Sequence, residues 1–231
     1  MAEDHPGSAG GPSRIDIVSD AICPWCWIGK RHLATALVEL EAEGERFAVH
    51  WRPFQLNPEM ALEGVERAAY RAAKFGSLER SRELDANLTA AGAATGLGFR
   101  FDRMLRTPNT VAAHRLIRLA GEDSAARQDA LVEALFQGYF QDGQDIGDHA
   151  VLARLAGQAG MDPAAVAGFL GGDAGRDEVV QEDAGFRRGG LSGVPTFALE
   201  GHVLFSGAMQ ADRMAEAFRR ALGILRERAA A

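Results

Sequence analysis

Cysteine is scarce in this chain: Cys23 and Cys26 are the only two cysteines among 231 residues. A structural zinc site needs four ligands, and no second cysteine pair is present to complete one. The six histidines are scattered, with no two of them three or four positions apart. A disulfide between residues this close together removes little chain entropy and stabilises weakly. The scarcity therefore favours a redox or nucleophilic use of the pair over metal binding or a passive cross-link.

Positive charge and long apolar runs are also lacking. The formal net charge is −7, the pI is about 5.4, and no basic cluster is interleaved with aromatic residues. This balance argues against nucleic acid and anionic membrane surfaces as partners. No stretch approaches the roughly 18 apolar residues that a membrane-spanning helix needs. With 47% hydrophobic and 25% charged residues, the composition is that of an ordinary globular protein, long enough for one large or two small domains.

The N-terminal segment lacks the basic start and apolar stretch of a secretory signal. It is polar and rich in glycine and proline, so we expect residues 1–12 to form a disordered tail. We also expect a cytoplasmic location, where stable structural disulfides are rare. Such a compartment favours a catalytic role for the cysteine pair.

The two cysteines lie where an apolar run typical of a strand, residues 15–22, meets a helical pattern over residues 27–43. A helix N-terminus carries unpaired backbone N–H groups and a partial positive charge, so a thiol placed there loses its proton more readily. Pro24 suits the first helical position. We therefore expect Cys23 at the helix cap, partly exposed and reactive, with Cys26 about one turn further on as the resolving thiol.

The rest of the chain divides into strand-like ends and a helical middle. Alternating apolar residues predict a second strand over 47–54, and two short apolar runs around Gly201 predict a hairpin over 195–199 and 202–206. An amphipathic final helix follows, with Met214, Phe218 and Leu222 on one stripe. Between residues 58 and 189 strand signals are almost absent. Helix-cap signals recur there, at Asn109, at Asp148 and at Asp162 with its following proline.

This order predicts an α/β fold. The first two strands, joined through a helix, should be parallel with a right-handed crossover. The hairpin should add an antiparallel pair to the same sheet. The helical residues inserted between the two halves should pack as a lid beside the cysteine pair.

Four segments carry a resemblance to a known family: DAICPWCWIGK at 20–30, WRPFQLNP at 51–58, NT with AHRL at 109–116, and GVPTF with SGA at 193–208. With them the chain resembles DsbA-like thioredoxin-fold proteins, specifically the FrnE-like branch grouped with 2-hydroxychromene-2-carboxylate isomerases. The resemblance implies a thioredoxin-like domain over 13–60 and 188–231 and a large all-helical insertion domain over 61–187.

The resemblance also implies a role for Pro195. In this fold the Val194–Pro195 peptide is cis and lies against the cysteine pair, where the proline shields the sulfurs and the preceding backbone pairs with substrate. The alternative is an ordinary trans proline that opens an edge strand, and the sequence order leaves both open.

Related isomerases and kappa-class glutathione transferases hold glutathione on this fold, typically with serine where Cys23 stands. Because this chain keeps both cysteines, dithiol–disulfide exchange is favoured over isomerase chemistry. Oxidising relatives often carry histidine where Trp25 stands. Tryptophan supplies no positive charge to a thiolate, so we expect a less oxidising couple.

Other side chains are candidates with competing interpretations. Asp20 would relay protons to the buried thiol or cap the turn. His114 would face the cleft or serve as a hydrogen-bonded structural histidine. Four apolar side chains would line a substrate groove or pack in the core: Trp27, Phe54, Leu56 and Met209. The predicted substrate-contacting set consists of Pro24, Trp25, Trp27, Phe54, His114 and Val194.

The leading hypothesis is a thiol–disulfide oxidoreductase of the protein-disulfide type, with Cys23, Cys26 and Pro195 as catalytic residues. Its substrate would be a protein or small molecule bearing a disulfide or thiol. We expect no metal and no cofactor beyond the dithiol, with glutathione as a candidate co-substrate and a monomer or homodimer as the assembly. The alternatives are a glutathione-dependent isomerase or transferase, and a redox-inert groove-binding or chaperone-like protein.

Overall fold

The computed structural model describes residues 11–230, so most of the tail expected at 1–12 lies outside the described residues. A mixed sheet runs in the order β2-β1-β5-β6 and is built from β1 (Ser13–Ser19), β2 (Phe47–Pro53), β5 (Thr196–Leu199) and β6 (His202–Ser206). β1 pairs in parallel with β2 and antiparallel with β5, and β5 pairs antiparallel with β6. The predicted parallel pair and added hairpin are therefore confirmed.

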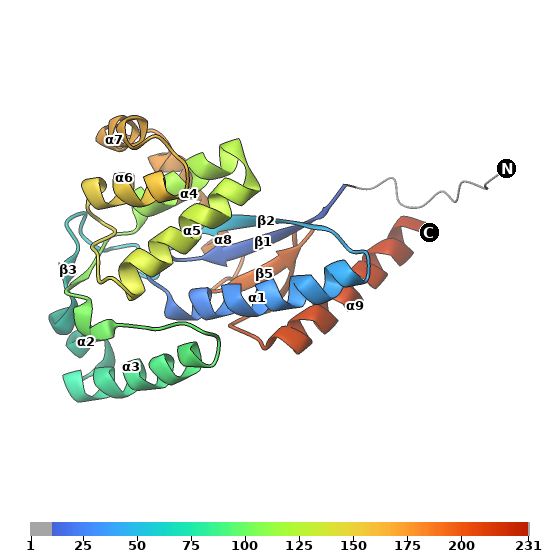
Figure 1. Ribbon diagram of the computed structural model, residues 1–231, viewed down its shortest axis with the longest axis horizontal. Helices are drawn as coiled ribbons and strands as arrows, with labels where there is room; N and C mark the ends of the chain where they lie inside the picture. Colours follow the sequence, from blue (N-terminus) through green and yellow to red (C-terminus); the bar gives the residue numbers. More distant parts are fainter. Residues whose placement is uncertain (1–10, 231) are drawn as a thin grey trace.

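Two helices lie side by side along one face of the sheet (Figure 1). They are α1 (Pro24–Ala42), which connects β1 to β2, and α9 (Ala211–Ala230). The predicted stripe of α9 is buried at Met214, Phe218 and Leu222, four residues apart on one face. At the solvent-exposed edge Arg219 of α9 forms ion pairs with Glu39 and Glu43 at the C-terminal end of α1. This packing places the start of α1 at the edge where β1 ends.

The segment between β2 and β5 is helical, as predicted. In chain order it contains β3 (Val65–Glu66), α2 (Arg67–Phe75), α3 (Leu78–Ala93), the 3₁₀ turn η1 (Phe101–Arg103), β4 (Arg106–Thr107), α4 (Val111–Asp123), α5 (Ala125–Phe140), α6 (His149–Gln158), α7 (Pro163–Gly171) and α8 (Arg176–Arg188). β3 and β4 form a two-stranded sheet that the sequence did not predict, because two residues are too few to show alternation.

Helix starts follow local chemistry. Asp148 and Asp162 cap α6 and α7 with their side chains, as predicted. Asn109 does not take the expected N-cap position, which Thr110 occupies without a side-chain cap hydrogen bond. The Asn109 side chain instead accepts a hydrogen bond from the Val111 N–H at 2.9 Å.

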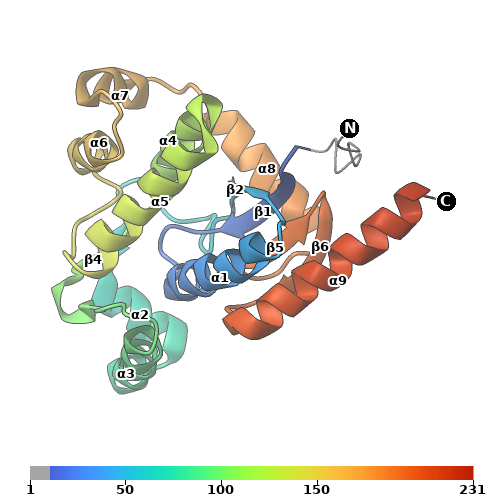
Figure 2. The same ribbon diagram turned by 45° about the vertical axis from the view of Figure 1, so that its right-hand side comes forward.

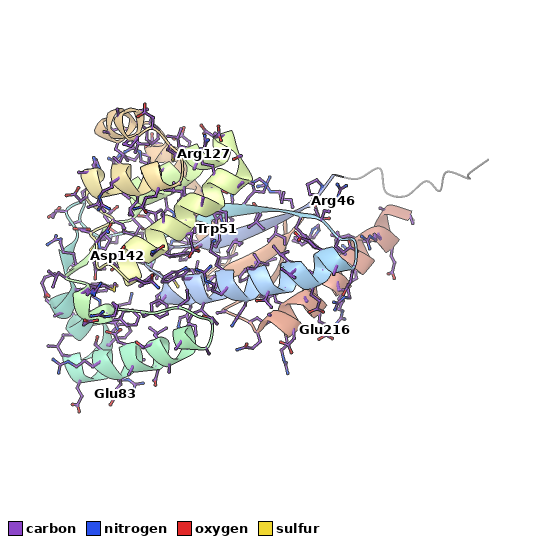
Figure 3. All side chains as sticks on the ribbon, viewed as in Figure 1. Arg46, Trp51, Glu83, Arg127, Asp142 and Glu216 are labelled. Atoms are coloured by element: carbon purple, nitrogen blue, oxygen red, sulfur yellow. The ribbon has the colours of Figure 1, made fainter. Side chains whose placement is uncertain are left out.

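The helical segment surrounds the rest of the molecule on two sides. α4, α5 and α8 pack along β2, whereas α2 and α3 lie beside the N-terminal end of α1 (Figure 2). Trp51, labelled in Figure 3, lies where α5 crosses β2. Its backbone exchanges hydrogen bonds with the buried Gln128 side chain of α5, at 2.9 and 3.1 Å. Such a satisfied buried amide fixes α5 against the sheet.

The apolar core runs continuously from the sheet into the helical segment. Trp27 of α1 packs on Phe99, Phe136 and Phe140, with ring centroids 5.5 to 6.1 Å apart. Each such aromatic pair contributes about 0.5–1.5 kcal/mol beyond its buried area. Because one core spans both predicted domains, the division of the chain into two domains stays a prediction. Within residues 11–230, every helix is too short or too polar to span a lipid bilayer.

Candidate active site

Cys23 is the N-cap of α1 and Pro24 occupies the first helical turn, as predicted. The Cys23 N–H donates to the Asp20 backbone oxygen at 3.0 Å, which closes the turn between β1 and α1. Two expectations for the sulfur were wrong. Cys23 is only 4% exposed, and its thiol donates to the Val194 backbone oxygen at 3.7 Å, whereas we had expected N–H donors around it. The segment before β5 covers the thiol from one side.

Cys26 lies deeper and is 1% exposed. Both cysteines are free thiols, so the structure represents the reduced dithiol. Burial raises the pKa of the Cys26 thiol well above its usual range, and the neighbouring Cys23 raises it further. The Ser19 hydroxyl and the Asp20 backbone oppose this effect only in part. Cys26 therefore stays protonated at neutral pH and needs a base before it can attack.

The Val194–Pro195 peptide is cis, and the proline ring lies against the start of α1. Gly29 makes this approach possible. A Cβ atom at Gly29 would lie 3.1 Å from Cγ of Pro195 and 3.3 Å from Cζ of Phe197. The glycine thus lets α1 carry the cysteine pair directly under the loop that precedes β5.

A cavity of about 450 Å³ opens in front of Cys23, within the range of small-molecule sites. Cys26 is not among its lining residues, so only the first sulfur faces it. Five predicted residues line the cavity: Cys23, Pro24, Trp25, Leu56 and Val194. Trp25 is 44% exposed.

Most of the remaining wall comes from the helical segment. Its apolar part consists of Phe75, Leu84, Leu88, Phe101, Met104, Tyr139 and Phe140. The helical segment therefore packs as the expected lid beside the motif. The site is shared between the two halves of the fold.

One wall of the cavity is cationic, although the whole chain is acidic. α2 presents Arg67, Arg71 and Lys74 to the cavity, and none of the aspartates and glutamates in the described part of the chain lines it. The two arginines share Asp85, at 2.9 and 2.7 Å. Lys74 has only neutral partners within the described residues, the Tyr70 hydroxyl at 2.6 Å and the Asn57 side-chain oxygen at 3.2 Å. The wall therefore carries excess positive charge.

Sequence reasoning missed this wall. A signal was present: Arg67, Tyr70, Arg71 and Lys74 are spaced to share one helix face. Nothing in that spacing indicates that the face meets Cys23, because the arrangement depends on how α2 packs on the rest of the fold.

Two predicted substrate contacts were wrong. Trp27 belongs to the aromatic core, and its indole N–H donates to Glu133 of α5 at 3.1 Å. Phe54 is buried under the Arg187 guanidinium, 4.1 Å from the ring centroid. Both side chains are 1% exposed and neither lines the cavity, so both belong to the core. Met209 does not line the cavity either, and its backbone oxygen contacts His32 Nδ1 at 2.7 Å.

His114 also lies outside the cavity, contrary to its expected place in the substrate-contacting set. It is 3% exposed, and its Nε2 faces Asp20 Oδ1 at 3.3 Å. Asp20 is fully buried, and its other oxygen accepts from the Leu56 N–H at 2.7 Å. The structure therefore brings Asp20 and His114 together behind the cysteine pair. No group of three or more potential metal ligands was found in the described part of the chain.

Comparison with known proteins agrees with this geometry. The family model of the DSBA-like thioredoxin domain matches residues 14–219. A probable DsbA oxidoreductase, SCO1869 from Streptomyces coelicolor, is 34% identical, with a TM-score of 0.81 over 91% of this chain and 90% of that chain.

Two more distant structures share the fold. The cytosolic disulfide reductase DsbM from Pseudomonas aeruginosa, solved with GSH, is 19% identical, with a TM-score of 0.62 over 90% of this chain and 98% of that chain. A 2-hydroxychromene-2-carboxylate isomerase is 16% identical, with a TM-score of 0.64 over 94% and 98%. With its family model covering most of its length, the chain belongs to the DSBA-like thioredoxin domain family.

Proposed function

We propose that the protein is a thiol–disulfide oxidoreductase that works through Cys23 and Cys26. One observation carries this proposal: a free thiol at a helix N-cap faces a cavity, with a second free thiol buried directly behind it. An attacking thiol needs access to substrate, whereas a resolving thiol needs only access to the first sulfur. The two positions match these roles, because Cys23 lines the cavity and Cys26 does not.

The reaction begins when the Cys23 thiolate attacks a substrate disulfide. The substrate S–S bond breaks, one half leaves as a thiolate that takes up a proton, and the other half stays bonded to Cys23. The Cys26 thiolate then attacks the Cys23 sulfur, the second half leaves, and the Cys23–Cys26 disulfide forms. The enzyme dithiol has given two electrons to the substrate. The reverse sequence oxidises a substrate dithiol.

Residues around Cys23 would position the substrate. Pro24 and Trp25 form the wall next to the sulfur, and the exposed indole offers apolar contact area to an incoming chain. Gly193 and Val194 also line the cavity, and the Val194 backbone supplies a carbonyl beside the sulfur. Pro195, held against Gly29, would keep this backbone in place.

A specific observation favours a small anionic thiol such as glutathione as co-substrate. The cationic face of α2 lies in the same cavity as Cys23, at a position that suits the carboxylates of such a molecule. DsbM, which shares the fold, was solved with GSH. A glutathione-dependent isomerase remains the alternative class on this fold. The retained Cys26 favours exchange, because an isomerase needs no resolving thiol.

The test is a pair of single-cysteine variants. Cys23→Ser should abolish turnover in the reduction of insulin, because the attacking sulfur is gone. Cys26→Ala should instead accumulate mixed disulfides on Cys23, visible on non-reducing gels of a cell extract. Full insulin reduction by Cys23→Ser contradicts the proposal, and so does a Cys26→Ala protein that traps neither protein nor glutathione.

A further inference from the structure

In the resolving step Cys26 must lose its proton, and the substrate cavity offers no direct route for that proton. Cys26 is buried, its pKa is raised by that burial, and it does not line the substrate cavity. When Cys23 carries a mixed disulfide, substrate occupies the side open to solvent. The proton of the Cys26 thiol must therefore leave through the interior of the protein.

Asp20 and His114 are buried ionisable side chains near the pair that do not line the substrate cavity. The Asp20 backbone lies against the Cys26 thiol, and its side chain faces His114 at 3.3 Å. Neither Asp20 Oδ1 nor His114 Nε2 has a well-aligned hydrogen-bond partner within residues 11–230, although both atoms are buried. Two buried polar atoms that face only each other are placed to share a proton.

Two internal spaces meet at His114. A void of about 10 Å³, roughly the space of one water molecule, is lined by Ser19 and His114 among others. Ser19 hydrogen-bonds the Cys26 thiol, so one residue of this void connects it to the resolving cysteine, which does not line the void itself. A second pocket, of about 180 Å³, is also lined by His114 and is bounded by β2, α4, α5 and α8. Trp51 borders both spaces.

The second pocket is separate from the substrate cavity, with which it shares no lining residue. Its ionisable groups are His50 and Arg52 from β2, Arg118 and Glu122 from α4, and Glu182 from α8. Two ion pairs balance most of their charge, Arg52 with Glu182 and Arg118 with Glu122. Asp16 of β1 also lies 3.9 Å from Arg52. The pocket is thus a polar region that holds no large excess of either charge beside His114.

We propose that Asp20 and His114 form a proton relay for Cys26 that opens into this second pocket, hereafter the rear pocket, which neither cysteine lines. The relay rests on the proposed function, since it serves the resolving step. His114 does not touch the sulfurs and acts through Asp20 as a positioning residue.

The Cys26 S–H bond breaks and its proton passes to the Asp20–His114 pair, directly or through the void beside Ser19. The resulting thiolate attacks the Cys23 sulfur of the mixed disulfide, the bond between Cys23 and the substrate breaks, and the substrate thiolate leaves through the front cavity. His114 then releases the proton to the rear pocket. In the reverse direction the pair returns a proton to Cys26.

A single-turnover reaction with 5,5′-dithiobis(2-nitrobenzoate) distinguishes the reaction of Cys23 from that of Cys26. The reduced protein releases one coloured thiolate when Cys23 attacks and a second when Cys26 resolves the mixed disulfide. In the unaltered protein the second release should rise with pH much less steeply than the roughly tenfold per pH unit of an unassisted thiol. His114→Gln should slow this release at least about tenfold at neutral pH, and its rate should rise steeply with pH. The first release should stay unchanged.

His32→Gln is the matched control, because His32 is another buried histidine with a polar partner and lies outside the relay. It should alter neither release. A purely structural role for His114 would slow both releases at every pH, and that result overturns the relay. An unchanged second release in His114→Gln overturns it too.

Two further measurements keep the relay testable if His114→Gln does not fold. Asp20→Asn should show the same selective loss of the second release. In the unaltered protein, a second release that climbs about tenfold per pH unit through neutrality means that no internal acceptor exists, which contradicts the relay without any variant. Complete absence of a second release would instead contradict the proposed function.

Discussion

The thiol of Cys23 and the backbone oxygen of Val194 are joined by a hydrogen bond of 3.7 Å. The contact links the cap of α1 to the loop that leads into β5. Once Cys23 enters a mixed disulfide it has no S–H to donate, so the Val194 oxygen becomes available to a substrate N–H. We therefore expect the same backbone group to serve the resting thiol and a bound substrate in turn.

The close approach of α1 to Pro195 predicts a size limit at Gly29. Gly29→Val should lower the free energy of unfolding by about 1–3 kcal/mol, because its methyl groups meet the Pro195 ring and Phe197. Gly223→Val is the matched control, since a Cβ at this helical glycine of α9 meets nothing within 4 Å. Urea denaturation of both proteins measures the difference. Equal stability of the two variants would show that α1 and Pro195 are not tightly packed.

The cationic wall predicts a charge preference among small substrates. Lys74→Gln should raise the KM for glutathione disulfide roughly fivefold, because an exposed charge of this kind contributes about 1 kcal/mol. The effect should fade at high salt, since screening weakens the attraction.

Arg80→Gln provides the control for Lys74. Arg80 is an exposed cation on α3 that pairs with Glu83 and lies outside the cavity lining. It should leave the KM for glutathione disulfide unchanged. If Lys74→Gln also leaves that KM unchanged, α2 does not select anionic substrates.

The buried resolving thiol predicts a loss of stability in alkali. The unfolded chain releases the Cys26 proton at about pH 8.5, whereas the folded protein holds it to higher pH. The folded state therefore binds more protons above that pH, and its stability falls as the pH rises through the folded pKa.

The slope is measurable by comparison with Cys26→Ala under reducing conditions. The unaltered protein should lose about 1.4 kcal/mol of unfolding free energy per pH unit relative to this variant above about pH 9. The pKa of Tyr139 is also raised by burial, but both proteins share that effect, so it cancels. Parallel pH profiles for the two proteins would mean that Cys26 titrates normally.

Local chemistry made much of the fold predictable from sequence. Pro24 at the start of a helix, the caps Asp148 and Asp162, and the hairpin around Gly201 are each set by a few neighbouring residues. Such features can therefore be recognised from the sequence without knowing the tertiary structure.

Non-local packing decided what the sequence did not show. Trp27 is an aromatic residue of a kind that also lines substrate grooves. Only its packing against α5 places it in the core. The meeting of Asp20 with His114, and of Lys74 with the cavity of Cys23, joins elements that are far apart in the chain. No pattern within one element specifies such meetings.

The central claim, that Cys23 and Cys26 form one redox couple, is tested most directly by titrating the protein in glutathione buffers and identifying the products by mass spectrometry. A single two-electron transition to the Cys23–Cys26 disulfide is the result we predict. Because Trp25 supplies no positive charge, its midpoint should be more negative than the value of about −120 mV typical of DsbA. A lasting glutathione adduct on Cys23, with no internal disulfide at any buffer ratio, would contradict the account and favour the glutathione-dependent alternative.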